Sequence, residues 1–279
     1  MAFLIGGANT TSDAAYDVAN SCRFNEADTA YMNITPGTPD TRTTMSFSVW
    51  VKRCTLSTVQ HLFKINGGAA NLIDLYFDAN DLLNARSIVA STTKATITNR
   101  KFRDVSAWYH ILVVWDTTQS TANNRCKIYI NGTQETSFGT QTNHDQNTLT
   151  ELNNDSGTTI GSGVSGATNF DGYMAELVFI DSTAYAASDF GEFNSDSPNI
   201  WQPTNPSGLT FGSNGRYLDF EDSANLGNDA NGGTDLTENN LAAVDQGSDS
   251  PTNNFATLNP LHFVDVAYVP VFSEGNLRI

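Results

Sequence analysis

The chain has 279 residues, and its 14 Lys and Arg against 30 Asp and Glu give a formal net charge of −16 at pH 7. This charge repels phosphate backbones and anionic lipid surfaces, so we expect no nucleic-acid partner. Charged residues make up only 16% of the chain and aromatic residues 10%, which is typical of a globular protein rather than of a disordered acidic one. No apolar run approaches the roughly 20 residues of a membrane span, so we expect no membrane insertion.

The three cysteines, Cys22, Cys54 and Cys126, lie far apart in the sequence. An odd number without close spacing argues against a disulfide framework and against a Cys-based zinc site. We expect three small buried apolar side chains. Met1–Ile5 is apolar but lacks the basic flank of a signal peptide, so the sequence predicts synthesis in a reducing cytoplasm.

Strand patterns separated by turn residues recur along the first hundred residues. Met45–Arg53 alternates most clearly, and Trp50 lies on the face opposite its apolar side chains. Prolines and glycines near residues 36–40 break the chain between strands. The other strands expected here are Ser21–Phe24, Ala30–Ile34, Leu62–Ile65, Leu72–Phe77, Leu82–Val89 and Ala95–Thr98.

The clearest local signal is a hairpin in the middle of the chain. Trp108–Trp115 is apolar on both faces apart from His110, which indicates a central strand with a hydrogen-bonded core histidine. Cys126–Ile130 alternates as a half-buried strand. Asn131-Gly132 follows it and supplies the two positive φ angles that a type I′ turn requires.

The second half of the chain has fewer strong patterns. Residues 138–156 are polar and are expected to form a long surface loop, followed by a short strand at Thr158–Ile160. Phe170–Asp181 is the second strong core strand, and its pattern predicts Tyr173, Ala175, Leu177 and Phe179 on one face. Ser188–Phe193 is expected to form one helical turn capped by Ser188. Arg216–Phe220, His262–Val271 and Leu277–Ile279 are the remaining expected strands.

Many short strands and no long helical period predict an all-β antiparallel sandwich with a loop-rich C-terminal extension. Three prolines and Trp201 within residues 198–208 indicate a boundary. We therefore expect a docking arm at 1–19, a sandwich at 20–202 and an acidic, turn-rich extension packed on it at 203–260. Residues 261–279 are expected to be strands that contact another subunit.

Several segments in this order resemble a laminin-G-like, or concanavalin A-like, jelly roll: SCRFNEADTAYMNI, MSFSVWVKR, FRDVSAWYHILVVWD, CKIYINGTQ and FDGYMAELVFID. The later segments ASDFGEFN, IWQP, GRYLDFEDSANLGND, DSPTNNFATLNPL and FSEGNLRI resemble bacteriophage virion proteins of the tail-fibre type, especially those of marine phages. The resemblance covers nearly the whole chain. It implies a structural or adhesive role in a virion.

Jelly-roll glucanases need two carboxylates that reach one substrate. Glu176 and Asp181 are the nearest candidates, but their opposite parity places them on opposite faces of a regular strand, so we expect no enzyme. The glycines of Gly161–Gly166 spell a dinucleotide-binding pattern, yet a strand rather than a helix follows, so a flexible turn is the better interpretation.

The acidic segment after the boundary is the candidate metal site. Calcium prefers six to eight oxygen ligands from carboxylates, amides and carbonyls. Laminin-G-like domains often hold calcium at the rim of the sandwich, as the resemblance implies. The spacing is not that of an EF-hand, and acidic turns are commonly only solvated loops. No cofactor is required, and the candidate calcium ligands are Asp219, Glu221, Asp222, Asn225, Asn228 and Asp229.

Trp50 and Trp201 are the candidate glycan-binding residues, because an exposed indole stacks on a sugar ring. The alternative is that both pack beneath a second layer or against a neighbouring subunit.

These expectations combine into a function. The resemblance implies a virion protein, most simply a tail fibre, spike or tail-tip component whose lectin-like domain contacts host-surface glycan. A head decoration or head fibre protein on the capsid is an alternative, and a glycan-degrading enzyme of the same fold is another. The expected partners are other virion proteins and copies of the chain itself, with a trimer implied for a fibre.

Overall fold

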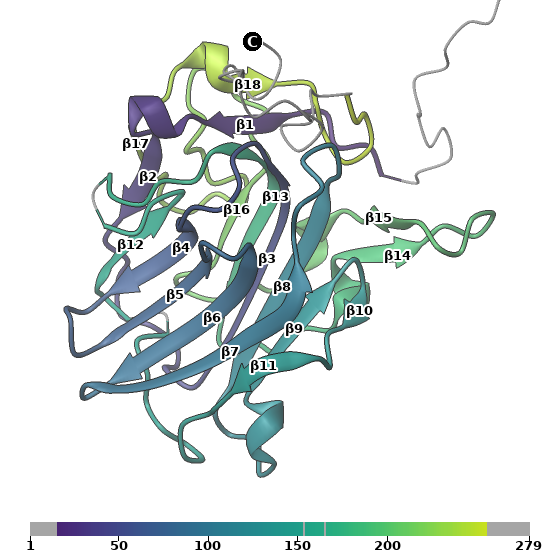
Figure 1. The fold of residues 1–279 in the computed structure, drawn as a ribbon. Coiled ribbons are helices and arrows are strands. Elements are labelled where there is room, and N and C mark those ends of the chain that lie inside the picture. The colour runs from purple at the N-terminus through teal and green to yellow at the C-terminus, as the bar shows by residue number, and fades with distance from the viewer. Residues whose placement is uncertain (1–15, 153, 165, 256–279) are drawn as a thin grey trace, which may run out of the picture.

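Two large antiparallel sheets pack face to face in the computed structural model, which describes residues 16–152, 154–164 and 166–255 (Figure 1). A separate hairpin of β14 (Gly191–Phe193) and β15 (Trp201–Pro203) extends from the side of the sandwich. No helix in these ranges is long and apolar enough to cross a membrane. The all-β antiparallel sandwich expected from the sequence is confirmed. The helical turns are η1 (Glu26–Asp28), η2 (Ala122–Asn124), η3 (Ala187–Asp189), η4 (Pro206–Gly208) and η5 (Ala243–Asp245).

The first sheet, sheet A, is built around β3 and β13, the two longest strands in it. Its strand order is β10-β9-β8-β3-β13-β1-β18, and β16 pairs with the second half of β13 beyond the end of β1. Its strands are β1 (Ser21–Phe24), β3 (Thr44–Arg53), β8 (Tyr109–Asp116), β9 (Cys126–Ile130), β10 (Thr133–Gln134), β13 (Gly172–Asp181), β16 (Arg216–Leu218) and β18 (Gln246–Gly247).

The second sheet, sheet B, has the order β11-β7-β6-β5-β4-β12-β2-β17. The extension after residue 203 therefore adds strands to both sheets: β16 and β18 to sheet A, and β17 to sheet B. The strands of sheet B are β2 (Tyr31–Ile34), β4 (Gln60–Asn66), β5 (Leu72–Phe77), β6 (Leu82–Val89), β7 (Thr92–Lys101), β11 (Phe138–Gln141), β12 (Gly157–Ile160) and β17 (Thr237–Asn239).

Alternating strands deliver one continuous apolar layer between the sheets. Phe47 of β3 stacks on Phe63 of β4 with ring centroids 4.8 Å apart, and Phe63 also lies 5.5 Å from Phe179 of β13. The three cysteines are free and buried, as expected. The inward parity expected for β3 is correct, because Met45, Phe47, Val49 and Val51 all belong to this layer.

One sequence prediction about β13 is wrong. A bulge interrupts its pairing with β3 between Ala175 and Val178, and Glu176 takes a positive φ of 47°. A bulge adds one residue to one strand and so reverses the alternation beyond it. Tyr173 and Ala175 consequently face outward, whereas Leu177 and Phe179 face the layer between the sheets.

Two local predictions also differ from the structure. The polar stretch expected to be only loop begins with β11, whose backbone pairs with β7 at the edge of sheet B. The helical turn expected at Ser188–Phe193 is instead η3, and the residues after it form β14. The amide of Ala186 donates to Asp189 Oδ2 at 2.8 Å, so Asp189 rather than Ser188 provides the capping contact.

The outer face of sheet A is covered by the chain itself. Phe190, Phe211 and Tyr217 pack over Leu112 and Val178, which face away from the layer between the sheets. A second outer cluster includes Val18, Trp50, Cys54, Trp108, Tyr173 and Ala175. These two clusters keep much of the outer face of sheet A away from solvent.

Both ends of the described chain are anchored on sheet A. The Val18 amide donates to Thr252 Oγ1 at 3.0 Å, and Val18 is only 2% exposed. The buried Lys52 Nζ donates to Asp249 Oδ2 at 2.8 Å and to the carbonyl of Phe255 at 2.6 Å. The rest of the expected arm, residues 1–15, and the expected C-terminal strands at 261–279 lie outside the described residues.

The Asn131-Gly132 turn has the two positive φ angles, 48° and 74°, that the sequence predicts. A Cβ added at Gly132 would lie 2.2 Å from the Trp201 ring. The positive φ and the close contact with this ring therefore both require glycine here. Gly68 also has a positive φ, 98°, but has open space around its Cβ position.

We expect Gly132→Ala to lower the free energy of unfolding by about 2–4 kcal/mol, because strain at positive φ adds to a clash with a ring held in place. Gly68→Ala is the matched control and should cost only about 1–2 kcal/mol, the part due to φ. Chemical denaturation measures both. Equal losses in the two variants would show that Trp201 does not constrain the turn.

Candidate functional site

The two tryptophans proposed for glycan stacking lie on the outer face of sheet A. Trp50 is 4% exposed, and its ring lies 5.1 Å from the His110 ring, so neither of its faces is presented to solvent. Trp201 is partly buried, stacks on His110 at 5.9 Å and meets Phe193 edge-on at 5.0 Å. The contacts of both rings are those of packing residues.

His110 also forms a serine–histidine pair that the sequence did not indicate. Its Nε2 lies 2.8 Å from Ser48 Oγ, and its Nδ1 accepts from Trp201 Nε1 at 3.1 Å. An indole can only donate, so Nε2 carries the ring proton and Ser48 is the acceptor. Burial lowers the pKa of His110 to about 3, and this neutral ring has no free nitrogen with which to activate Ser48.

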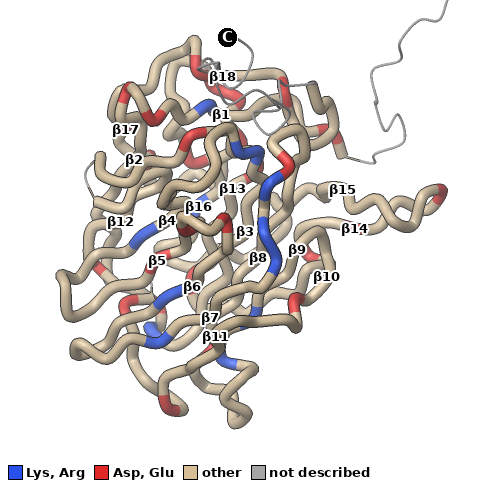
Figure 2. The backbone as a smooth tube through the Cα atoms, viewed as in Figure 1, with Lys and Arg blue, Asp and Glu red and all other residues tan. Residues whose placement is uncertain are grey.

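The predicted calcium ligands make turns rather than one shared site. Asp219 Oδ1 accepts from the amide of Glu221, and Asp222 Oδ1 accepts from that of Ala224. Asn225 donates to Asp235 at 2.8 Å. These Asx contacts fix the acidic loop, which lies near β17 and β18 where acidic residues gather (Figure 2).

Asn228 and Asp229 continue the same loop. The amide of Asn228 donates to the Asn225 carbonyl, and Asp229 Oδ1 accepts from the amides of Tyr217 and Asn231. Within the described ranges, no group of three or more His, Cys, Asp or Glu side chains is arranged to hold a metal ion. Calcium binding stays a prediction from the sequence.

The two carboxylates weighed for catalysis also have separate partners. Glu176 accepts from Tyr217 Oη at 2.8 Å on the outer face of sheet A. Asp181 Oδ2 accepts from the backbone amides of Asp40 and Asn214 at the end of β13. Each carboxylate therefore has a structural role in fixing backbone or neighbouring side chains.

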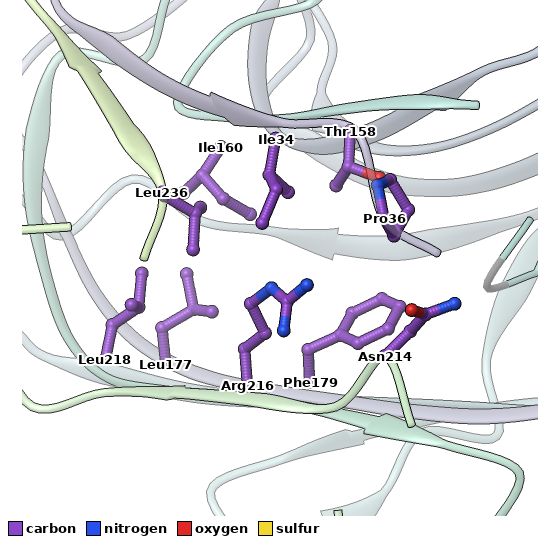
Figure 3. A pocket seen from close by; sticks show the side chains of 10 residues that line it. All are labelled: Ile34, Pro36, Thr158, Ile160, Leu177, Phe179, Asn214, Arg216, Leu218 and Leu236. Carbon is purple, nitrogen blue, oxygen red and sulfur yellow. The ribbon is translucent and has the colours of Figure 1, made fainter. Parts of the chain in front are cut away.

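An apolar pocket opens at the edge of the sandwich between β2 and β12 on one side and β13 and β16 on the other (Figure 3). Its empty space is about 410 Å³, counting the part open to solvent. β16 pairs with β13 here, and Leu236 of the extension also lines the pocket. The lining residues are Ile34, Pro36, Thr158, Ile160, Leu177, Phe179, Asn214, Arg216, Leu218 and Leu236.

Arg216 is the charged residue in this pocket. Its side chain rises from β16 between the two walls, with the guanidinium inside the pocket (Figure 3). Nη1 donates to the Gly215 carbonyl at 3.3 Å and lies 3.7 Å from Asp229 Oδ2, which is too long for a hydrogen bond. Burial lowers the pKa of Arg216, and Asp229 offsets part of this effect.

A polar groove adjoins the pocket and shares Asn214 and Arg216 with it. Its empty space is about 1050 Å³, counting the part open to solvent. Three loops meet there, and some of their glycines leave no room for a Cβ: on Gly233 it would lie 2.3 Å from Asp229 Oδ2, and on Gly212 it would lie 2.5 Å from the Asp181 carbonyl oxygen. The other lining residues are Gly37, Thr38, Gly212, Ser213, Gly215, Asn231, Gly232 and Thr234.

The polar groove and the apolar pocket together form what we call the Arg216 site. Sequence reasoning selected Asp229, which lies 3.7 Å from Arg216, but for calcium, and it missed Arg216 and Asn214. The repeated glycines at 212, 215, 232 and 233 were the available signal, because a glycine often marks a close approach of backbone to another group. Their loops are far apart in sequence, so their meeting point could not be read from the sequence.

A buried acid cluster lies apart from this site. Glu176 is 6% exposed, and the hydroxyl groups of Tyr16 and Tyr217 lie 2.9 Å apart beside it. The pKa of Glu176 is raised to about 8. Burial is the largest cause, the hydrogen bonds from the two tyrosines oppose it, and the nearby charges of Asp219 and Glu221 add to it. The protonated acid is therefore the form that the folded protein favours at neutral pH.

We expect this acid to make stability fall with rising pH. Between the ordinary value of 4.5 and about 8, the folded state keeps a proton that the unfolded state has released, so the free energy of unfolding falls through that window. Glu176→Gln stays neutral at every pH. Between pH 5 and 9 its free energy of unfolding should therefore fall by about 2–4 kcal/mol less than that of the wild type.

Urea unfolding at a series of pH values measures the effect. Glu192→Gln, on the exposed strand β14, is the control and should keep the wild-type pH dependence. A Glu176→Gln variant with that same dependence would contradict the assignment of the proton to Glu176.

Residues 26–187, more than half of the chain, match the family described as the concanavalin A-like lectin/glucanases superfamily. No curated protein sequence matches the chain. Among solved structures, a candidate carbohydrate-binding protein of Bacteroides ovatus is 14% identical with a TM-score of 0.49, over 80% of this chain and 59% of that one. Domain 4 of an arabinanase from Geobacillus stearothermophilus is 21% identical with a TM-score of 0.47, over 63% and 76%. A pentraxin from Limulus polyphemus is 16% identical with a TM-score of 0.41, over 62% and 81%.

Proposed function

Because the chain belongs to the concanavalin A-like lectin/glucanases superfamily, we propose that it is a glycan-binding protein and that the Arg216 site binds the glycan. The observation that carries this is the junction of a polar groove with an apolar pocket at one buried arginine. Sugars present hydroxyl groups on their edges and apolar C–H faces between them. A site for them combines hydrogen-bonding groups with an apolar wall.

The polar side of the site supplies groups suited to hydroxyl recognition. Asn231 and Thr234 are exposed, and Ser213 Oγ donates to Asp40 Oδ1 at 2.7 Å, so each can exchange bonds with a sugar. Arg216 adds a donor held by burial in one orientation. Groups fixed in advance lose less entropy when a ligand binds.

The protein's role is adhesive and not enzymatic. Glu176 and Asp181 bind different partners, and the Ser48–His110 pair is held in an inactive hydrogen-bonding direction. Its proposed place is a bacteriophage virion, as a tail fibre, spike or tail-tip component that contacts glycan on the host surface. Its partners there are other virion proteins and copies of itself, as a trimer.

The resemblance to virion proteins supports this placement. ASDFGEFN, IWQP and GRYLDFEDSANLGND lie mostly beyond the residues that match the superfamily. They form η3, β14, β15, β16 and the acidic loop, which cover sheet A and build one wall of the Arg216 site. Immunogold labelling of intact particles should mark the tail. Labelling of the capsid would favour the head decoration protein instead.

Thr234→Arg should lower glycan affinity at least tenfold, about 1.4 kcal/mol, because a long side chain at this exposed position fills the groove. Thr140→Arg, exposed on β11 of sheet B, adds the same charge elsewhere and should leave affinity unchanged. Calorimetry with host-surface polysaccharide measures both. Depolymerisation of that polysaccharide by the wild type would overturn the adhesive role.

A further inference from the structure

Resting on the proposed function, we infer that the Arg216 site selects sugars that carry an acetyl substituent. The carbonyl oxygen of the acetyl group accepts from the Arg216 guanidinium, and its methyl group enters the apolar pocket. The sugar ring then lies in the polar groove, with its hydroxyls facing Asn231 and Thr234. Amides and esters share this acetyl chemistry, so both N-acetyl and O-acetyl sugars are included.

The arrangement of the pocket walls supports the position of the methyl group. Ile34, Ile160 and Leu236 form one wall, and Leu177 and Leu218 form the other (Figure 3). No hydroxyl of an unsubstituted sugar would find a partner among these side chains, and burying it there would be unfavourable. A methyl group gains by leaving water for the same surroundings.

The surroundings of Arg216 favour a neutral acceptor over a carboxylate. Asp229 lies 3.7 Å from the guanidinium and is 3% exposed, so it balances the positive charge without a direct hydrogen bond. Asp40 and Asp181 lie at the adjoining loop, where Asp181 accepts from the Asn214 amide. A sugar carboxylate would meet these negative charges, whereas a carbonyl oxygen would not.

The long distance between Arg216 and Asp229 leaves hydrogen-bonding capacity on both. Among the described residues, Asp229 Oδ2 is buried and has no hydrogen-bond partner. A buried acceptor without a donor is costly, and such atoms in native proteins call for an explanation. Asp229 is not among the residues that line the pocket or the groove, so it acts on the ligand only through its ion pair with Arg216.

The test compares matched ligands on the whole chain by calorimetry. N-acetylated chitin oligosaccharides are compared with their deacetylated forms, and acetylated xylan fragments with deacetylated ones. We expect the acetylated member of at least one pair to bind about 10- to 100-fold more tightly. A saturation-transfer NMR experiment should show the acetyl methyl as the proton group closest to the protein, without the need for any variant.

Ile34→Phe fills the pocket from a partly buried position and should remove the preference for the acetylated ligand. Its melting temperature checks that it folds. Equal binding of both forms by the wild type, lost in Thr234→Arg, would overturn the acetyl inference and leave glycan binding intact. Tighter binding of a uronic-acid oligosaccharide would also overturn it. A screen of host-surface glycans with no binding at all would overturn the proposed function itself.

Discussion

The bulge in β13 is the constraint on which the rest of this structure depends. With Glu176 at a positive φ, Leu177 and Phe179 turn toward the layer between the sheets, and Val178 turns outward. A regular strand would place Leu177 and Phe179 under the outer cover and turn Glu176, Val178 and Ile180 toward the layer between the sheets. On the other edge of β13, pairing with β1 stops at Met174, and β16 pairs with the strand from Leu177 onward. The Arg216 site exists because β16 is there.

The covering of sheet A explains why the candidate site lies at the edge of the sandwich. The segment after β13 packs Phe190, Phe211 and Tyr217 over the outer apolar residues of β8 and β13. Trp201 closes the neighbouring area over His110 and Gly132. These aromatic residues hold the outer layer in place. The proposed site therefore lies at the loops that follow β2 and precede β16 and β17.

The buried cations also differ between the covered sheet and the candidate site. The buried cations have structural partners: Lys52 binds Asp249, and Arg53 lies 3.2 Å from Asp81. Arg216 differs because its nearest carboxylate is 3.7 Å away and its guanidinium lies in an apolar pocket. Breaking a buried pair is costly, so the first two are fixed elements of the fold. The third pair is longer, and its guanidinium is the donor that the proposed glycan site uses.

The sequence by itself determined the fold class, the central hairpin and the inward face of β3, because each depends on neighbours in the chain: a period of two, or a turn that favours Asn-Gly. Local pattern could not reveal the bulge at Glu176, since its φ depends on pairing with β3 and on the contacts with Tyr16 and Tyr217. It also could not reveal the Arg216 site. That site brings together side chains from Ile34 to Leu236, and only the packing of two sheets places residues so distant in sequence around one arginine.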